Sequence, residues 1–277
     1  MAMTQPHEWN AMDPGASDNV LRIVKQEAER FFKLIDTPEH WEAPTASGWW
    51  HVRDIVGHLV DTTEGYLVRF EAARTGSDPG ALAALPDMAT TADSRAQEFR
   101  QTSREELTKR LKDVYGRMMN VFQGLSADDW TNLTVMHGYM GPLPAFFYPV
   151  FQIMDYGVHS WDVRQGLEMP HYLHADVGDI LTPFMFILWQ ATTDTNKIGN
   201  EPLDVGIRVS GRNAGTWRVK VTSEGMTYEA GDIDDAPAIL EFDPASLVLT
   251  AFGRTHAGTA YGDIKLANRF SGCFFPI

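Results

Sequence analysis

The chain has 277 residues, of which 44% are hydrophobic and 22% are charged, a composition typical of a globular protein. Its formal net charge of -14 argues against nucleic acid or an anionic membrane as partner, because phosphate groups are bound by clustered Lys and Arg. The single cysteine, Cys273, excludes an intramolecular disulfide and suits a reducing compartment.

Neither the N-terminal segment nor the most hydrophobic segment predicts targeting to a membrane. The first 15 residues are polar, contain two prolines and lack the apolar stretch of a signal peptide. The most hydrophobic segment, residues 180–190, is too short to span a bilayer. We therefore expect a cytoplasmic protein, and the sequence leaves open whether it is a monomer or a homodimer.

The first part of the chain has helical periodicity. Apolar residues at helical spacing predict four helices, at residues 18–36, 51–74, 103–125 and 145–167. Ser103 and Glu106 have the spacing of a capping box at the start of the third helix. Residues 79–86 and 138–144 contain Gly and Pro, and we expect both to be connections. Four helices with polar connections predict an antiparallel four-helix bundle.

The apolar period changes near residue 200. Before the change, residues 175–195 predict a linking helix, with Pro183 in the first turn of its buried part. After it, residues 205–209, 217–221 and 226–230 alternate as strands of a small antiparallel sheet, and residues 245–252 and 262–270 predict two short helices. The predicted class is α+β, with a bundle domain at residues 1–170 and an α+β domain at residues 171–277.

Two helical turns centred on histidine carry the strongest chemical signal. His58 lies on the second predicted helix, and Asp155 and His159 lie four residues apart on the fourth, so they share one face of that helix. Two imidazoles and a carboxylate with one open position are typical ligands of a catalytic divalent metal. The alternative is a buried polar network that fixes the register of the helices.

Each of these histidines is followed by an aspartate three residues later. Asp61 and Asp162 are thus candidate catalytic residues, because a carboxylate one turn away can orient a metal-binding imidazole. The alternative for both is a salt bridge along the helix, with Arg53 or Arg164 as partner.

The same segments resemble a known family. WWHVRDIVGHLVDTTEGYL and MDYGVHSWDVRQGL are similar to the metal-binding bundle of mycothiol-dependent maleylpyruvate isomerases, within the DinB-like superfamily. The closing AFGRTHAGTAYGDIKLANRFSGCFFPI resembles the C-terminal domain of those proteins, which is similar to sterol-carrier-protein folds. The resemblance covers nearly the whole chain and implies a DinB-like bundle followed by a sterol-carrier-protein-like domain.

The resemblance also implies site residues and cofactors. It implies zinc at His58, His159 and the acid at position 155, where the family typically carries Glu and this chain carries the shorter Asp155. This departure leaves another divalent metal, or an empty site, open. The resemblance further implies that Arg254 binds an anionic substrate or a thiol cofactor, which suits a guanidinium, whereas the residues alone equally allow a surface Arg at a helix end.

The implied reaction is an isomerisation or S-transfer that uses mycothiol or a similar thiol. A metal-bound thiolate adds to an activated double bond, and rotation followed by loss of the thiol converts cis to trans, whereas a leaving group would give S-transfer. A metal-bound water would instead give hydrolysis. The competing hypothesis is a non-catalytic or metal-free small-molecule-binding protein whose metal site has degenerated.

Overall fold

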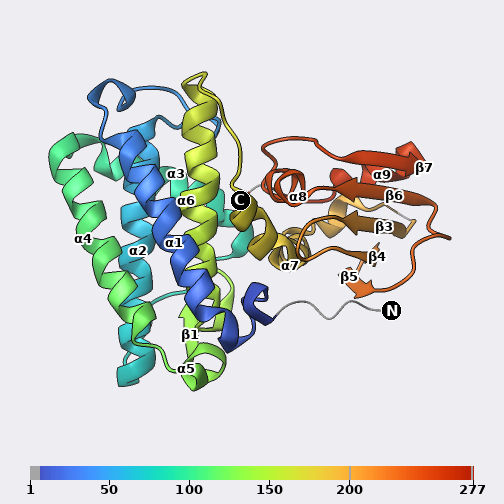
Figure 1. The fold of residues 1–277 in the computed structure, drawn as a ribbon, viewed down its shortest axis with the longest axis horizontal. Coiled ribbons are helices and arrows are strands. Elements are labelled where there is room, and N and C mark those ends of the chain that lie inside the picture. Colours follow the sequence, from blue (N-terminus) through green and yellow to red (C-terminus); the bar gives the residue numbers. More distant parts are fainter. Residues whose placement is uncertain (1–6, 200, 276) are drawn as a thin grey trace. The chain divides into compact units, whose positions relative to one another are not determined.

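A computed structural model describes residues 7–199, 201–275 and 277. Its internal contacts divide the chain into two compact units, one of residues 10–173 and one that combines residues 7–9 with residues from 174 onward (Figure 1). The first unit is mostly helical and the second combines helices with a sheet, which confirms the expected α+β class. In the described part of the chain, no helix is long and apolar enough to cross a membrane.

The helical unit contains all four predicted long helices, each within a few residues of its expected bounds. Its elements are α1 (Ser17–Ile35), α2 (Val52–Thr75), α3 (Met88–Glu98), α4 (Arg104–Gln123), α5 (Ala127–Asn132), β1 (Thr134–His137), β2 (Gly141–Pro144) and α6 (Phe147–Gly166). Ser103 caps α4, because its side chain accepts a hydrogen bond from the Glu106 N–H, which is one of the two bonds of the predicted capping box.

The four long helices form two pairs, parallel within each pair and antiparallel between them (Figure 1). Asp54 pairs with Arg100 and Glu64 with Arg110 at the same separation of 46 residues, so α2 runs parallel to the stretch that includes α4. Arg104 donates to the Ile35 carbonyl, which brings the start of α4 to the end of α1. The long connection of residues 76–103, which includes α3, returns the chain to the end where α2 began and so permits this order.

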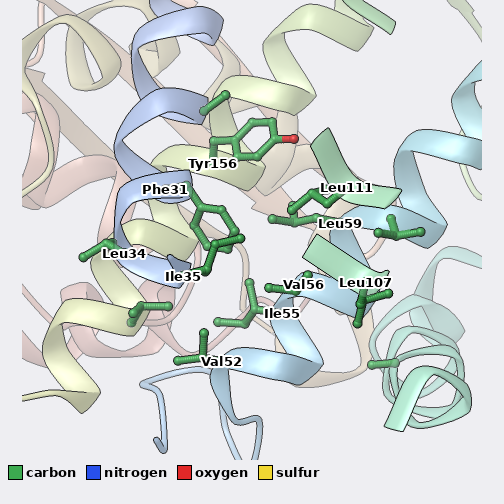
Figure 2. Close-up of a cluster of buried hydrophobic side chains, with 14 of the residues drawn as sticks. Phe31, Leu34, Ile35, Val52, Ile55, Val56, Leu59, Leu107, Leu111 and Tyr156 are labelled. Atoms are coloured by element: carbon green, nitrogen blue, oxygen red, sulfur yellow. The ribbon is translucent and has the colours of Figure 1, made fainter. Parts of the chain in front are cut away.

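A buried cluster holds the bundle together (Figure 2). The helices contribute side chains one or two turns apart, as with Ile55 and Leu59 on α2, Leu107 and Leu111 on α4, and Tyr156 and Val163 on α6. Burial of each such side chain stabilises the fold by about 1.5–3 kcal/mol. Since Leu59 is fully buried, the backbone of its neighbour His58 is held by this core.

Residues 138–144, expected to be a loop, belong partly to a two-stranded hairpin. β1 and β2 pair antiparallel, with His137 opposite Gly141. Gly141 has a φ of 76°, which a residue without a side chain adopts readily. Pro142 and Pro144 cannot donate to a ladder, and a two-stranded hairpin tolerates them because its outer edges are unpaired.

The second unit contains a five-stranded sheet with helices against one face. Its elements are α7 (Ala175–Thr192), β3 (Leu203–Val209), β4 (Gly215–Thr222), β5 (Gly225–Ala230), β6 (Ala238–Phe242), α8 (Pro244–Ala251), β7 (Thr259–Gly262) and α9 (Ile264–Ser271). The strand order is β5-β4-β3-β6-β7, antiparallel except for the parallel pair β3 and β6. The three predicted strands pair as expected, whereas β6 and β7 had no clear sequence signal.

Pro183 does not lie in the first turn of a helix, as we expected, but inside α7. Proline has no N–H, so the carbonyl of Asp179 one turn earlier loses its helical partner. The fully buried Asn213 replaces that donor, with its Nδ2 2.6 Å from the Asp179 oxygen. Asn213 also donates to the Trp9 carbonyl, at 3.1 Å, which attaches the N-terminal segment to this unit.

Candidate metal centre

The structure brings the three predicted ligands together between α2 and α6. One ligand atom from each of His58, Asp155 and His159 lies within 4.8 Å of the other two. The Nε2 of His58 is 3.8 Å from an oxygen of Asp155, and the side chains are 19% and 17% exposed. Tetrahedral ligands about 2.1 Å from zinc are about 3.4 Å apart, so small rotations would close this set around an ion.

The shorter acid at position 155 therefore reaches the two imidazoles. Gln152, one turn earlier on α6, is 3.4 Å from the second oxygen of Asp155 and the same distance from the Thr63 hydroxyl on α2. These contacts orient the carboxylate while leaving the oxygen nearest His58 to serve as a ligand. The donor set, partly open to solvent, fits a divalent cation.

A buried carboxylate orients His159. The Nδ1 of His159 is 2.9 Å from an oxygen of Asp162, which is fully buried. A carboxylate accepts from Nδ1–H, so Nε2 of the same ring carries the lone pair that a metal requires. This is the contact that the spacing of Asp162 predicted, although its catalytic role stays a prediction.

Asp61 is held differently from Asp162. Both the Nε and the Nη2 of Arg95 donate to one of its oxygens, at 3.1 and 2.7 Å. Asp61 therefore forms a salt bridge, but with Arg95 on α3. Arg53, one of the partners that we expected, pairs with Glu42 instead. A role for Asp61 in catalysis stays a prediction without support from this contact.

A tryptophan that sequence analysis did not select covers both imidazoles. The ring of Trp50 lies 5.0 Å from the ring of His58 and 6.0 Å from that of His159. Its indole N–H donates to Asp93 on α3, at 2.6 Å. Trp50 lies eight residues before His58 and precedes α2, so no helical spacing in the sequence relates its position to that of His58.

The charge of Asp155 acts on neighbouring tyrosines. Burial, followed by this charge, raises the pKa of Tyr66 and of Tyr156 well above the ordinary value of 10.0. Both phenols therefore stay protonated at neutral pH, and neither supplies a base.

Arg254 belongs to the other unit, just beyond the end of α8. Its backbone N–H donates to the Leu249 carbonyl and its Nη1 to the Phe252 carbonyl, at 2.8 and 2.9 Å. These bonds hold it near the C-terminus of a helix, as its position in the sequence suggested. Its binding of a substrate or thiol stays a prediction.

Comparisons with known proteins give one family match and several structures of similar fold. The model of the mycothiol maleylpyruvate isomerase N-terminal domain matches residues 21–164. The crystal structure of the mycothiol-dependent maleylpyruvate isomerase aligns with a TM-score of 0.60 at 12% identity, covering 88% of this chain and 92% of that one. A histidine-to-alanine mutant of that isomerase aligns with the same TM-score of 0.60 at 11% identity, over the same 88% and 92%.

No curated protein matches the sequence. At identities this low, the structural likeness shows the fold, and the family assignment comes from the domain model, whose match includes His58, Asp155 and His159. That match covers more than half of the chain. The chain therefore belongs to the mycothiol maleylpyruvate isomerase family.

Proposed function

We propose that this protein is a zinc-dependent isomerase that uses mycothiol, or a similar low-molecular-weight thiol, to convert a small unsaturated acid from cis to trans. In this reaction the thiol adds to the activated double bond, the resulting single bond rotates, and elimination returns the thiol. The observation that carries the proposal is the set of three ligand atoms of His58, Asp155 and His159 within 4.8 Å. Membership of the family supplies the thiol and the class of reaction.

A divalent cation at this site would lower the pKa of a coordinated thiol, so that the thiol reacts as thiolate at neutral pH. The protein's own residues prepare that site. Asp162 holds the proton of His159 at Nδ1, which keeps Nε2 available. Gln152 orients the Asp155 carboxylate, and the ring of Trp50 packs beside both imidazoles.

The family and the need for an activated double bond support this substrate class. A carboxylate or ketone conjugated to that bond stabilises the carbanion formed when a thiolate adds. Arg254 is proposed, on the resemblance alone, as a residue that binds the anionic substrate or the thiol. In Arg254→Ala protein we expect a higher KM for one of the two with the metal content unchanged.

The deciding experiment is the metal content per chain, measured by elemental mass spectrometry after purification without an affinity-metal step. Wild-type protein should hold about one zinc, and Asp155→Ala and His159→Ala should lose it. Asp113→Ala and His171→Ala are matched controls, because both residues are exposed and lie outside the cluster. The controls should keep the wild-type zinc content.

Activity is then measured with a cis unsaturated acid, with and without the thiol. Wild-type turnover should need both zinc and thiol, and Asp155→Ala should lose it while retaining the wild-type circular dichroism. Wild-type protein without metal, or with full turnover after exhaustive chelation, would refute the proposal and favour a metal-free binding protein or catalyst on the same scaffold.

A further inference from the structure

His137 is a buried histidine, outside the three proposed ligands, whose tautomer the fold determines. It is the last residue of β1 and only 7% exposed. Its Nδ1 faces two backbone donors, the N–H groups of Tyr139 and Met140, at 3.3 and 3.2 Å. Because a backbone N–H can only donate, Nδ1 is the acceptor and the ring proton lies on Nε2.

The Nε2–H of His137 has no hydrogen-bond partner in the described part of the chain. It is also not among the fully buried unpaired polar atoms, so this nitrogen keeps some access to solvent. Four aromatic rings lie around the imidazole: those of Phe151, Tyr66 and Tyr148, with centroids 5.2, 6.0 and 6.2 Å away on α6 and α2, and that of Tyr139, 6.1 Å away in the hairpin. An N–H donor in an aromatic setting, buried yet accessible, is a typical element of a small-molecule site.

The same two helices carry His137's neighbours and the proposed metal ligands. Phe151 precedes Asp155 by one turn of α6, and Tyr66 follows His58 by about two turns of α2. A helix rises about 1.5 Å per residue, so these rings lie about 6 and 12 Å along the helices from the ligands. The charge of Asp155 is also felt at His137, where it acts to raise the pKa of the imidazole.

Arg69 makes this region favourable for an anion. Its guanidinium donates to the carbonyls of Met136 and Ala81, both at 3.3 Å, so it braces β1 beside His137. Burial, and then the charge of Arg69, lower the pKa of His137 to about 4. The imidazole is therefore a neutral donor at pH 7, beside a fixed positive charge, and a cation that neutralises Asp155 would leave the region more positive still.

We propose that the Nε2–H of His137 and the positive charge of Arg69 form a carboxylate-binding subsite beside the metal centre. It takes one carboxylate of the small unsaturated acid, while the rings of Tyr66 and Phe151 contact the apolar part of the same molecule. The inference rests on the proposed function for the identity of the acid's reacting end. The subsite itself depends only on residues of the helical unit.

The test compares two substitutions that divide the functions of the imidazole. His137→Asn keeps an acceptor near the Nδ1 position and removes the distant donor. His137→Gln keeps a donor near the Nε2 position and loses the near acceptor. Binding of maleate, used as a dicarboxylate probe, and of its dimethyl ester is measured by titration calorimetry on zinc-loaded and metal-free protein. Zinc content and melting temperature are measured on the same samples.

Wild-type protein should bind maleate more tightly than the ester. His137→Asn should weaken maleate binding about tenfold or more, the value of a hydrogen bond to a charged acceptor, with unchanged zinc content and ester binding. His137→Gln should stay within about threefold of wild type. If the melting temperature shows that His137→Asn is unfolded, Arg69→Gln supplies the same test, because it removes the charge and should weaken maleate but not the ester.

Absence of maleate binding, equal affinity for maleate and ester, or equal maleate affinity in wild type and the folded donor-free variant would each overturn the subsite. These results would leave a zinc-containing protein, and hence the proposed function, untouched. Conversely, protein that holds no zinc would refute the proposed function, while the contrast between His137→Asn and His137→Gln in metal-free protein would still decide the subsite.

Discussion

Asp162→Asn tests whether a buried carboxylate prepares His159 to bind metal. The substitution preserves size and shape at a fully buried position where the carboxylate oxygen is 2.9 Å from Nδ1 of His159. If the new amide donates its N–H to Nδ1, the ring proton moves to Nε2 and blocks the ligand atom. If it accepts through its oxygen instead, the bond is a neutral one and polarises the imidazole less.

The magnitude follows from the bond that is lost. A hydrogen bond to a charged group contributes about 1.5–3 kcal/mol and a neutral one about 0.5–1.5 kcal/mol. Replacing the first with the second should therefore cost about 1–2 kcal/mol of the zinc-binding free energy. That difference corresponds to about a 5-fold to 30-fold rise in the zinc Kd. Partners that orient metal-binding histidines contribute about 10-fold to 100-fold in affinity, and we therefore expect a rise of at least 10-fold.

The assay is competition for zinc against a chromophoric chelator, with circular dichroism to confirm the fold. Asp61→Asn is the matched control, because Asp61 also follows a proposed ligand by three residues but is bound by Arg95. Its zinc Kd should change by less than about threefold, the effect of an exposed salt bridge. A wild-type Kd in Asp162→Asn, or an equal rise in both variants, would refute the orienting role of Asp162.

Three further predictions concern stability and are measured by urea unfolding. Arg100→Met should cost about 2 kcal/mol at pH 7, less than a fully buried pair because the Arg100 side chain is 30% exposed. Burial acts to raise the pKa of Asp54, but the bond from Arg100 and other contacts hold that pKa below 3.8. The difference in unfolding free energy between wild type and Arg100→Met should therefore shrink as the pH falls below that value. A difference that stays constant with pH would show that the ion pair does not cause it. Gly166→Ala should destabilise by at least about 2 kcal/mol because its new Cβ would lie 2.1 Å from a backbone oxygen, whereas Gly116→Ala, with open space around it, should stabilise by about 0.5–1 kcal/mol; equal effects would contradict this reasoning. Asn213→Ala should cost about 1–3 kcal/mol by leaving the carbonyl opened by the proline in α7 without its side-chain donor, and an unchanged midpoint would show that water replaces it.

Local periodicity was enough to predict the long helices and three of the strands. Leu107 and Leu111 recur one turn apart because one face of α4 is buried, and such a repeat is visible in the sequence. The helix α3 was missed because most of its residues are at least partly exposed, so its apolar pattern is weak. The strand β6 was missed because it has only 5 residues and pairs in parallel with β3, a contact that depends on the whole sheet.

The candidate metal centre was only partly predictable for the same reason. Asp155 and His159 share a face of one helix, so their spacing alone places them together. His58 lies on another helix, so its spacing could not place it beside them, and it was joined to them by ligand chemistry and by the family resemblance. His137 lies at the end of β1 and Trp50 lies before α2, and tertiary packing brings both near the candidate ligands. No spacing in the sequence predicts such a contact.

The two aspartates show where a helical repeat stops being informative. Asp61 and Asp162 stand at the same distance after His58 and His159, and the sequence gives no reason to separate them. In the structure Asp162 is fully buried and bonded to its histidine, whereas Asp61 remains 28% exposed on its side chain and is bound by Arg95 of α3. The difference arises because α3, a helix that periodicity did not predict, supplies a cation on the α2 side. An aspartate one turn after a histidine therefore becomes an orienting group only where the neighbouring elements offer it no competing cation, and this depends on tertiary structure.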